Sequence, residues 1–296
     1  MQNEDKIACI IVNYNSWKQT LRLVKNIINF SIINHIIIVD NCSTDASNAK
    51  LSKFKNEKYI YIETKHNGGY GFGNNIGIRM AQKLNDEFVL ISNPDTYFNE
   101  ACLIDMIEKY NAETNCSLMN AVETYMGVCA WKNISIFEDI LNTSIIMNKI
   151  LKSRYYSKNY FVGNGTVPVD IIQGSFLLVR TELMLKYGMY DEDFFLYEEE
   201  KVLYHKFNSA GYQAFTDLDV SFEHRHNEYG AKKISNYVTG KKRLIKSKIL
   251  YLKKYKKLKG LFLVMSRLFF RLTILEMYMY SFILLTRRKI NDRKNR

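Results

Sequence analysis

The sequence predicts an α/β protein built around a mostly parallel, doubly wound sheet. Short β-branched apolar runs alternate with segments of helical spacing, and each of the first runs ends in a polar cluster. No internal repeat or low-complexity linker interrupts this alternation. The chain has 296 residues, 47% of them hydrophobic, which is enough for one large α/β core and an additional segment.

The first two strand and helix pairs are well marked. Residues 7–12 form an apolar run that stops at polar residues, and residues 17–30 then show helical spacing. Residues 36–39 form the second strand, and Ser43 or Thr44 is expected to cap a helix that ends near residue 54.

The later elements follow the same pattern with one gap. A strand is expected at 59–63, a glycine-rich segment at 67–77, a helix at 75–84 and a strand leading to Asp95. No order of elements is predicted for residues 112–168. A strand is then expected at 175–180, a helix at 199–210 and one or two strands at 213–222.

The chain is basic, and its positive charge is concentrated near the C-terminus. The formal net charge is +12 and the pI is near 9.3, with basic residues dense at 241–259 and 287–296. Such charge favours a polyanionic partner, which can be nucleic acid, an anionic membrane or a phosphorylated substrate. Nucleic acid is not expected, because bulky aliphatic residues interleave with the basic ones and no nucleic-acid-binding motif is present.

The cysteines and the N-terminus favour a reducing compartment. Five scattered cysteines without CxxC spacing indicate neither a disulfide framework nor a zinc site. The acidic first residues lead directly into a strand and lack the layout of a signal peptide. A cytoplasmic protein is therefore expected.

The C-terminal segment 241–296 is expected to form a basic, amphipathic helical tail. Residues 261–285 are mostly apolar but contain Arg267, Arg271 and Glu276, and these charges argue against a membrane-spanning helix. An interfacial helix on anionic lipid fits this pattern. Packing against the rest of the chain or against a second subunit is the alternative.

Asp95 is a candidate metal ligand. It follows one of only two prolines at the end of a strand, so its carboxylate is held rigidly where open α/β sheets bind ligands. A hard divalent cation needs one or two carboxylates together with substrate phosphates. A turn aspartate that caps the next helix is the alternative.

Asp40 and Tyr14 end the second and the first strand. The Asp40 carboxylate can accept an N–H from a base edge and the Tyr14 ring can stack on the base, so the pair could hold a uracil or a thymine. A helix-capping role for Asp40 stays open.

The glycine-rich segment can let the backbone approach a phosphate at a helix N-terminus, although a plain flexible loop is the alternative. A dinucleotide-binding fingerprint would need glycine at position 74, which is Asn74, and should follow the first strand. A Rossmann dehydrogenase is therefore excluded.

Two further clusters, one acidic and one basic, contain residue types that can take part in catalysis or metal binding. The acids at 198–200 begin a predicted helix, where the helix dipole favours them, and they also fit a general base. The His-Arg-His at 224–226 could complete a metal site or offset diphosphate charge, and a surface histidine is the alternative.

Several motifs also follow one another in a characteristic order. They are Ile-Val-Asn-Tyr-Asn at 11–15, Val-Asp-Asn-Cys-Ser-Thr-Asp at 39–45, the glycine-rich segment 67–77, Asn-Pro-Asp at 93–95, Gln-Gly-Ser-Phe-Leu-Leu-Val-Arg at 173–180 and Phe-Phe-Leu-Tyr-Glu-Glu-Glu at 194–200. Together they resemble the inverting family-two glycosyltransferases of the GT-A fold, in particular the rhamnosyltransferase-like branch. The resemblance covers roughly residues 6–255.

The resemblance implies a role for each matching residue. It assigns Glu200, or failing it Glu199, as the general base that deprotonates the acceptor hydroxyl, and Asp95 with His224 as metal ligands for Mg²⁺ or Mn²⁺. The nucleotide-sugar site would be formed by Val12, Tyr14, Asp40, Asn67, Gly69, Asn74, Asn93 and Asp95, and the acceptor site by Gly174 and Tyr197.

The sequence departs from the family pattern around the metal and the base. Asn93 replaces the first acid of the metal motif, and Glu200 replaces the usual Asp. The acid expected two places later is Val202, and the usual Arg on that helix is Lys206. A catalytically degenerate GT-A domain that binds sugar nucleotide or an assembly partner is therefore the alternative.

The resemblance implies an inverting, metal-dependent hexosyltransferase that moves rhamnose, galactose or a similar sugar. The donor would be a UDP- or dTDP-sugar, and the acceptor a lipid-linked or oligosaccharide precursor of a bacterial cell-surface polysaccharide. The protein is expected on the inner face of the cell membrane, held through its tail, and a homodimer stays open. Residues 1–240 would form the catalytic domain, with a nucleotide-sugar-binding half at 1–99 and an acceptor-binding half at 100–240.

Overall fold

The computed structural model describes residues 6–225 and 234–294, and the chain divides into two compact units. The first unit comprises residues 1–132, 156–195 and 199–226. The second unit comprises residues 133–155, 196–198 and 227–296. The predicted division at residue 240 stays a prediction.

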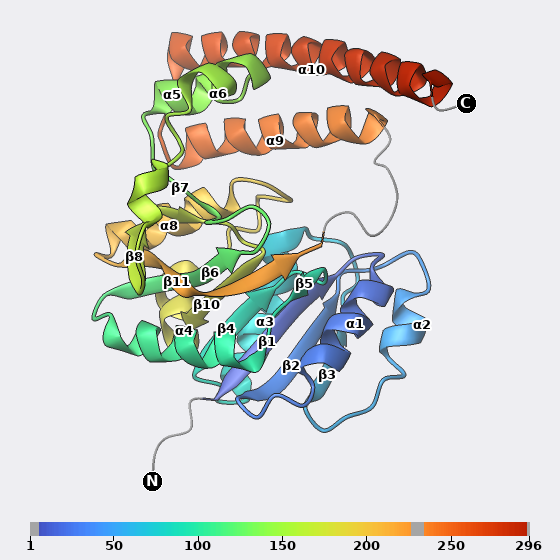
Figure 1. The fold of residues 1–296 in the computed structure, drawn as a ribbon, viewed down its shortest axis with the longest axis vertical. Coiled ribbons are helices and arrows are strands. Elements are labelled where there is room, and N and C mark those ends of the chain that lie inside the picture. Colours follow the sequence, from blue (N-terminus) through green and yellow to red (C-terminus); the bar gives the residue numbers. More distant parts are fainter. Residues whose placement is uncertain (1–5, 226–233, 295–296) are drawn as a thin grey trace. The chain divides into compact units, whose positions relative to one another are not determined.

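The first unit is built on a nine-stranded, mostly parallel sheet (Figure 1). Its strand order is β3-β2-β1-β4-β10-β6-β11-β5, with β8 beside β11. The strands are β1 (Ile7–Asn13), β2 (Ile33–Asp40), β3 (Tyr59–Glu63), β4 (Phe88–Ser92), β5 (Thr96–Tyr97), β6 (Cys116–Glu123), β8 (Thr166–Val169), β10 (Phe176–Arg180) and β11 (Gln213–His224). The neighbours from β3 to β4 are parallel, and β10 is antiparallel to β4 and β6. A separate ladder pairs β7 (Ala130–Trp131) with β9 (Ile171–Ile172). The predicted fold class is confirmed.

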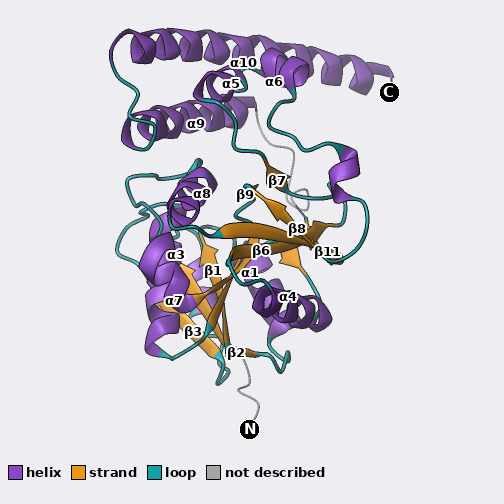
Figure 2. Cartoon of the chain, turned by 90° about the vertical axis from the view of Figure 1, so that its left-hand side faces the viewer, coloured by secondary structure: helices purple, strands orange, loops and turns teal. Residues whose placement is uncertain are grey.

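Helices cover both faces of this sheet (Figure 2). The helices of the first unit are α1 (Trp17–Ile27), α2 (Ser47–Leu51), α3 (Tyr70–Lys83), α4 (Glu100–Ala112), the 3₁₀ turn η1 (Lys158–Phe161), α7 (Thr181–Leu183), the π-helical turn η2 (Met184–Gly188) and α8 (Glu199–Ser209). Alternate residues of β1 point to opposite faces, so Cys9 lies in one core with α1, α2 and α4, whereas Ile10 lies in the other with α3 and α8. Both β1 residues are completely buried.

Helix α3 begins at Tyr70 rather than at residue 75, so most of the predicted glycine-rich loop is helical. A Cβ atom added at Gly73 would lie 2.7 Å from Cγ1 of Val12, and one at Gly77 would lie 2.4 Å from Cγ2 of Ile10. These glycines therefore let the helix pack directly on β1, where any side chain would collide.

The second unit is helical. It contains α5 (Ile136–Leu141), α6 (Ile145–Leu151), α9 (Ile234–Lys254) and α10 (Gly260–Lys294), and α9 and α10 run antiparallel to each other (Figures 1 and 2). A small core joins α5, α9 and α10 through Ile140, Ile245, Leu252 and Phe270. In the described part of the chain, no helix has a long enough apolar stretch to cross a membrane.

Candidate active site

The candidate site begins at the carboxyl ends of β1 and β2, where Asn13 and Asp40 are neighbours in register. Asn13 Nδ2 donates to Asp40 Oδ1 at 3.0 Å, and Ser43 Oγ donates to the same oxygen at 2.5 Å. Tyr61 Oη donates to Asp40 Oδ2 at 3.0 Å. The buried carboxylate therefore links β1, β2 and β3, and these three hydrogen bonds are fewer than the roughly four that a carboxylate can accept. Its predicted contact with a base stays a prediction.

Ser43 or Thr44 was expected to cap the following helix, and this prediction is wrong for both residues. Helix α2 begins only at Ser47, and Asp45 Oδ1 accepts the Ser47 N–H at 2.9 Å. Ser43 instead donates to Asp40 and accepts the backbone N–H of Asn15 at 2.9 Å. Its hydroxyl thus connects the turns that follow β1 and β2.

Tyr14 lies in the turn after β1 with 47% of its surface exposed. This exposure leaves a ring face accessible, as the stacking role requires. Val12, also assigned to the nucleotide site, lies two residues earlier against Gly73 of α3. Its position therefore depends on the close contact between β1 and α3.

The turn before α3 is held by asparagine side chains. Asn41 Nδ2 donates to Gly69 O at 2.8 Å and to Asn67 Oδ1 at 3.1 Å. Gly69 has φ of +94°, and an added Cβ would lie 2.2 Å from the carbonyl oxygen of Phe195. Asn74 is buried one turn into α3 and donates to Tyr70 O at 3.1 Å. These contacts fix the N-terminus of α3 at the same edge of the sheet.

Asp95 and His224, which are 129 residues apart, meet at this edge. His224 Nε2 lies 3.0 Å from Asp95 Oδ1, and the Asp95 carbonyl accepts the Arg225 N–H at 2.9 Å. The side chains are 4% exposed for His224 and 21% exposed for Asp95. A carboxylate oxygen is a suitable ligand for Mg²⁺ or Mn²⁺ when substrate phosphates complete the coordination, and an imidazole nitrogen suits Mn²⁺ rather than Mg²⁺.

Cationic side chains lie next to this pair. The Arg225 guanidinium stacks over the Tyr97 ring at 4.2 Å, and Arg22 Nη1 donates to Tyr97 Oη at 3.0 Å. Of this basic group, the His-Arg-His run at 224–226 had indicated Arg225 as a cation that could offset diphosphate charge. Arg22 and Tyr97 stand in no motif, and no local pattern shows that they meet Arg225.

Glu200 and Gly174, assigned as base and acceptor residue, are in contact. Glu200 Oε1 accepts the Gly174 N–H at 3.3 Å, and Tyr70 Oη donates to the Gly174 carbonyl. Burial, followed by the nearby Glu200 and Glu199 carboxylates, raises the pKa of Tyr70, so the phenol stays protonated. The sequence analysis missed Tyr70, which is 104 residues from its partner.

The metal motif and the base segment are connected through the start of β10. The Asn93 N–H donates to the Ser175 carbonyl at 2.8 Å, next to Gly174. Phe176 then pairs with Ser92, the last residue of β4. The candidate metal ligands and the candidate base therefore lie at the same edge of the sheet.

The structure shows the surroundings of Val202 and Lys206, the two residues of α8 that depart from the family pattern. Val202 is 1% exposed on the buried side of α8, and Lys206 Nζ donates to the carbonyl of Met189. Glu199 is also buried, at 5% exposed, in the first turn of α8. His226 lies outside the described residues.

The residues before α8 have an uncommon backbone conformation. Tyr197 and Glu198 both lie in the left-handed region, with φ of 75° and 72°. Each such non-glycine residue costs about 1–3 kcal/mol, and such strain clusters at functional sites. Tyr197 is 37% exposed, so its side chain is accessible for the predicted acceptor role.

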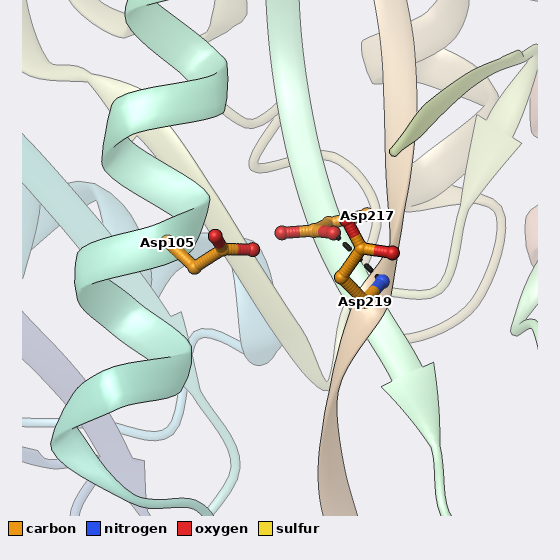
Figure 3. A group of neighbouring side chains, drawn as sticks. All are labelled: Asp105, Asp217 and Asp219. Atoms are coloured by element: carbon orange, nitrogen blue, oxygen red, sulfur yellow. Dashed lines mark hydrogen bonds between the residues drawn. The ribbon is translucent and has the colours of Figure 1, made fainter. Parts of the chain in front are cut away.

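Three acids elsewhere in the first unit lie as close together as the ligands of a metal ion. Asp105, Asp217 and Asp219 bring carboxylate oxygens within 4.8 Å of one another (Figure 3). Lys109 Nζ, however, lies 2.6 Å from an oxygen of each of the three. The ammonium group occupies the position that a cation would take, so the cluster is an ion-pair network between α4 and β11.

Residues 8–181, more than half of the chain, match the glycosyl transferase family 2. The low-salt glycan biosynthesis hexosyltransferase of Haloferax volcanii is 30% identical over 200 residues, which cover 66% of this chain and 59% of that protein. Rhamnosyltransferase WbbL of Escherichia coli strain K12 is 25% identical over 218 residues, which cover 69% of this chain and 78% of that protein. The chain therefore spans less than two thirds of the length of the Haloferax relative.

A solved structure supports the fold. The mannosyltransferase PcManGT from Pyrobaculum calidifontis, in complex with GDP-Man and Mn²⁺, superposes with a TM-score of 0.57 at 14% identity, covering 96% of this chain and 79% of that chain. The strand order, the polar carboxyl edge of the sheet and the family match agree with the predicted resemblance. The chain belongs to glycosyl transferase family 2 and has the GT-A fold.

Proposed function

We propose that this chain is an inverting hexosyltransferase that moves rhamnose, galactose or a similar sugar from a UDP- or dTDP-sugar to a polysaccharide precursor. The observation that carries this proposal is the common edge of the sheet, where Asp95 and His224 lie near the start of β10 and Glu200 contacts Gly174. The names of the relatives, a glycan hexosyltransferase and a rhamnosyltransferase, support this substrate class.

Asp95 and His224 would hold a divalent cation, and the Mn²⁺ in the mannosyltransferase complex supports this assignment. The cation would neutralise the charge that develops on the leaving diphosphate. Arg225 and Arg22 contact Tyr97, two residues after Asp95, and Arg225 is also paired with Glu223 at 2.6 Å. Before the cation binds, the buried His224 holds the Asp95 carboxylate in place.

Glu200 would take the proton from the attacking acceptor hydroxyl. The Gly174 N–H holds one carboxylate oxygen, and the neutral Tyr70 phenol orients the Gly174 peptide. Attack from the face opposite the diphosphate inverts the anomeric carbon in one displacement. A GT-A domain that binds sugar nucleotide without transfer is the alternative, and it is favoured by Val202 at the position where an acid is usual.

Binding and transfer can be tested separately with two variants. In thermal unfolding, UDP or dTDP compounds with Mn²⁺ should raise the Tm of the wild type, because a ligand at about 100 times its Kd adds about 2.7 kcal/mol. Asp95→Ala should lose this shift. Glu200→Gln should keep the shift and lose transfer to a lipid-linked acceptor. Absence of a shift with every nucleotide would overturn the donor assignment, and a shift without wild-type transfer would favour the non-catalytic alternative.

We also propose that the second unit binds an anionic membrane surface, in agreement with a lipid-linked acceptor. Seven apolar residues of α10 recur every three or four positions, and each is more than half exposed: Leu261, Met265, Leu268, Leu272, Leu275, Met279 and Phe282. We call them the α10 stripe. Residues 241–296 hold 18 of the 42 Lys and Arg residues but two of the 30 Asp and Glu residues, so this unit has the charge that anionic lipid attracts.

A coiled-coil dimer would also use such a stripe, but the neighbouring positions argue for lipid. They carry Phe262, Val264 and Tyr278, each at least half exposed, where a coiled coil usually has charged pairs. The acid Glu276 is already engaged, because it accepts hydrogen bonds from Ser144 Oγ and from two backbone N–H groups of α6. A broad apolar face with basic surroundings is typical of a helix lying in the membrane interface.

Vesicle sedimentation tests this proposal. The full chain should bind vesicles rich in phosphatidylglycerol more strongly than phosphatidylcholine vesicles, and added salt should weaken the binding. Leu268→Glu with Leu272→Glu should reduce binding at least tenfold without changing nucleotide-induced stabilisation. Unchanged binding by this double variant would overturn the proposal, and a concentration-dependent dimer that the variant abolishes would favour the coiled coil.

A further inference from the structure

A buried lysine of the second unit holds the segment that leads into the candidate base. Lys248 of α9 has a side chain that is 4% exposed, and its Nζ lies 2.9 Å from Oε1 of Glu198. The same Nζ donates to both carboxylate oxygens of Asp139 in α5, at 2.8 and 2.9 Å. The Lys248 ammonium group of α9 thus bridges the carboxylates of Asp139 in α5 and of Glu198.

The neighbouring residue of α9 supports the same segment. Ser247 Oγ donates to the carbonyl of Leu196 at 2.7 Å. Residues 196–198 therefore have both a backbone carbonyl and a carboxylate fixed by consecutive residues of α9. Tyr197, between these two anchors, and Glu198 itself have the left-handed conformation that non-glycine residues rarely adopt. Such a conformation persists only where surrounding contacts hold it.

We propose that Lys248 is a positioning residue for the general base. The chain passes without interruption from Glu198 into Glu199 and Glu200, so the direction of the chain at residue 198 sets where the first turn of α8 places Glu200. Lys248 also neutralises one of three consecutive acids. Without it, the Glu198 carboxylate would be a buried charge beside Asp139 and would move toward water, taking the start of α8 with it.

This inference rests on the proposed function for the role of Glu200, but the placement of the segment can be measured without activity. The contact that carries it is between side chains that share the second unit, 50 residues apart in the sequence. A misplacement of about 1 Å at a reacting group can lower a rate about a hundredfold. Such a loss should appear in kcat, because the donor site lies on other elements.

The test compares Glu198→Gln and Lys248→Met with Lys246→Met, a matched control at an exposed position of α9. Glu198→Gln keeps the shape of the side chain and the Lys248–Asp139 pair, so it should fold even if Lys248→Met does not. We expect Glu198→Gln to lower kcat for transfer at least tenfold, with unchanged donor KM and unchanged nucleotide-induced Tm shift. Hydrogen exchange of the backbone amides at 196–202 should accelerate, while exchange in α3 stays unchanged.

The outcomes separate this inference from the proposed function. If the wild type transfers sugar and Glu198→Gln has wild-type kcat and exchange, the positioning role is wrong. If the wild type shows no transfer, the proposed function fails, and faster exchange at 196–202 in Glu198→Gln would still support the placement of the segment by Lys248. An equal kcat loss in Lys246→Met would also contradict the proposal.

Discussion

Replacing Lys109 by Met should destabilise the first unit in a way that depends on pH. Lys109 contacts three carboxylates at 2.6 Å, and its side chain is 20% exposed, whereas Asp217 is completely buried. Removing one partner of a buried ion pair costs about 3–5 kcal/mol. Because Lys109 and Asp219 retain contact with water, we expect a loss of about 2–3 kcal/mol at pH 8.

The direction of the pH dependence follows from Asp217. Burial raises the pKa of Asp217 to about 6, above the ordinary value of 3.8. The folded chain therefore binds this proton more tightly than the unfolded chain, and the stability from this group is lost as pH rises through the folded pKa. Without Lys109, the neighbouring carboxylates of Asp105 and Asp219 should raise the pKa of Asp217 further. Each tenfold gain in proton affinity of the folded chain adds about 1.4 kcal/mol to its stability at low pH. The loss in Lys109→Met should therefore shrink by about 1–2 kcal/mol at pH 5.

Urea unfolding at pH 5 and pH 8, with Lys246→Met as a surface control, measures both effects. The control should change stability by less than about 0.5 kcal/mol at either pH. An equal loss in Lys109→Met at both pH values would refute the reasoning, because it would mean that protonation of the acids does not relieve the unpaired charge. Mn²⁺ alone should not raise the stability of the wild type through this cluster. If it did, and if Asp217→Asn removed the effect, the three acids would bind a metal ion in spite of Lys109.

The remaining predictions concern packing and hydrogen bonds. Gly77→Ala should lower the free energy of unfolding by about 1–2 kcal/mol, because overpacking against Ile10 exceeds the gain in helix propensity. Gly240→Ala, where the nearest atom to the added Cβ is Tyr197 Oη at 3.4 Å, should instead raise it by about 0.5–1 kcal/mol, and urea unfolding checks both signs. Tyr61→Phe should cost about 1 kcal/mol without changing nucleotide-induced stabilisation, and a lost thermal shift would contradict a structural role.

Much of the first unit follows from the sequence because local patterns are strong there. The first four strands are short apolar runs bounded by polar residues, and the alternation with helices predicts parallel pairing, but the order β3-β2-β1-β4 was not predicted. The start of α3 was misplaced because glycine lowers helix propensity, and sequence spacing does not show that Ile10 and Val12 need this space.

Apart from β6 (Cys116–Glu123), the unassigned region 112–168 contains short elements with weak periodicity. Ser135 and Glu138 form a capping box at the start of α5, a signal that was present in the sequence and was not used. The two-residue strands β7 and β9, in contrast, depend on pairing across about 40 residues, which no local pattern reveals.

At the candidate site, the motifs supplied the candidate residues but not the contacts between them. Asp95 and Glu200 stand in recognisable motifs, whereas the contacts of Tyr70 with Gly174 and of Lys248 with Glu198 are long-range and leave no spacing signal. The exposed α10 stripe was visible as an apolar segment, but only the structure shows which of its residues face away from α9.

The row of glycines on α3 constrains how this protein can change through mutation. Residues 71, 73 and 77 can gain a side chain without a loss of stability only when a facing residue becomes smaller at the same time, since Tyr190, Val12 and Ile10 occupy the space. Substitutions at these facing pairs should therefore tend to arise together. Strand β1 and helix α3 are thus coupled in how their sequences can change, while the exposed positions of the same helix stay free to vary.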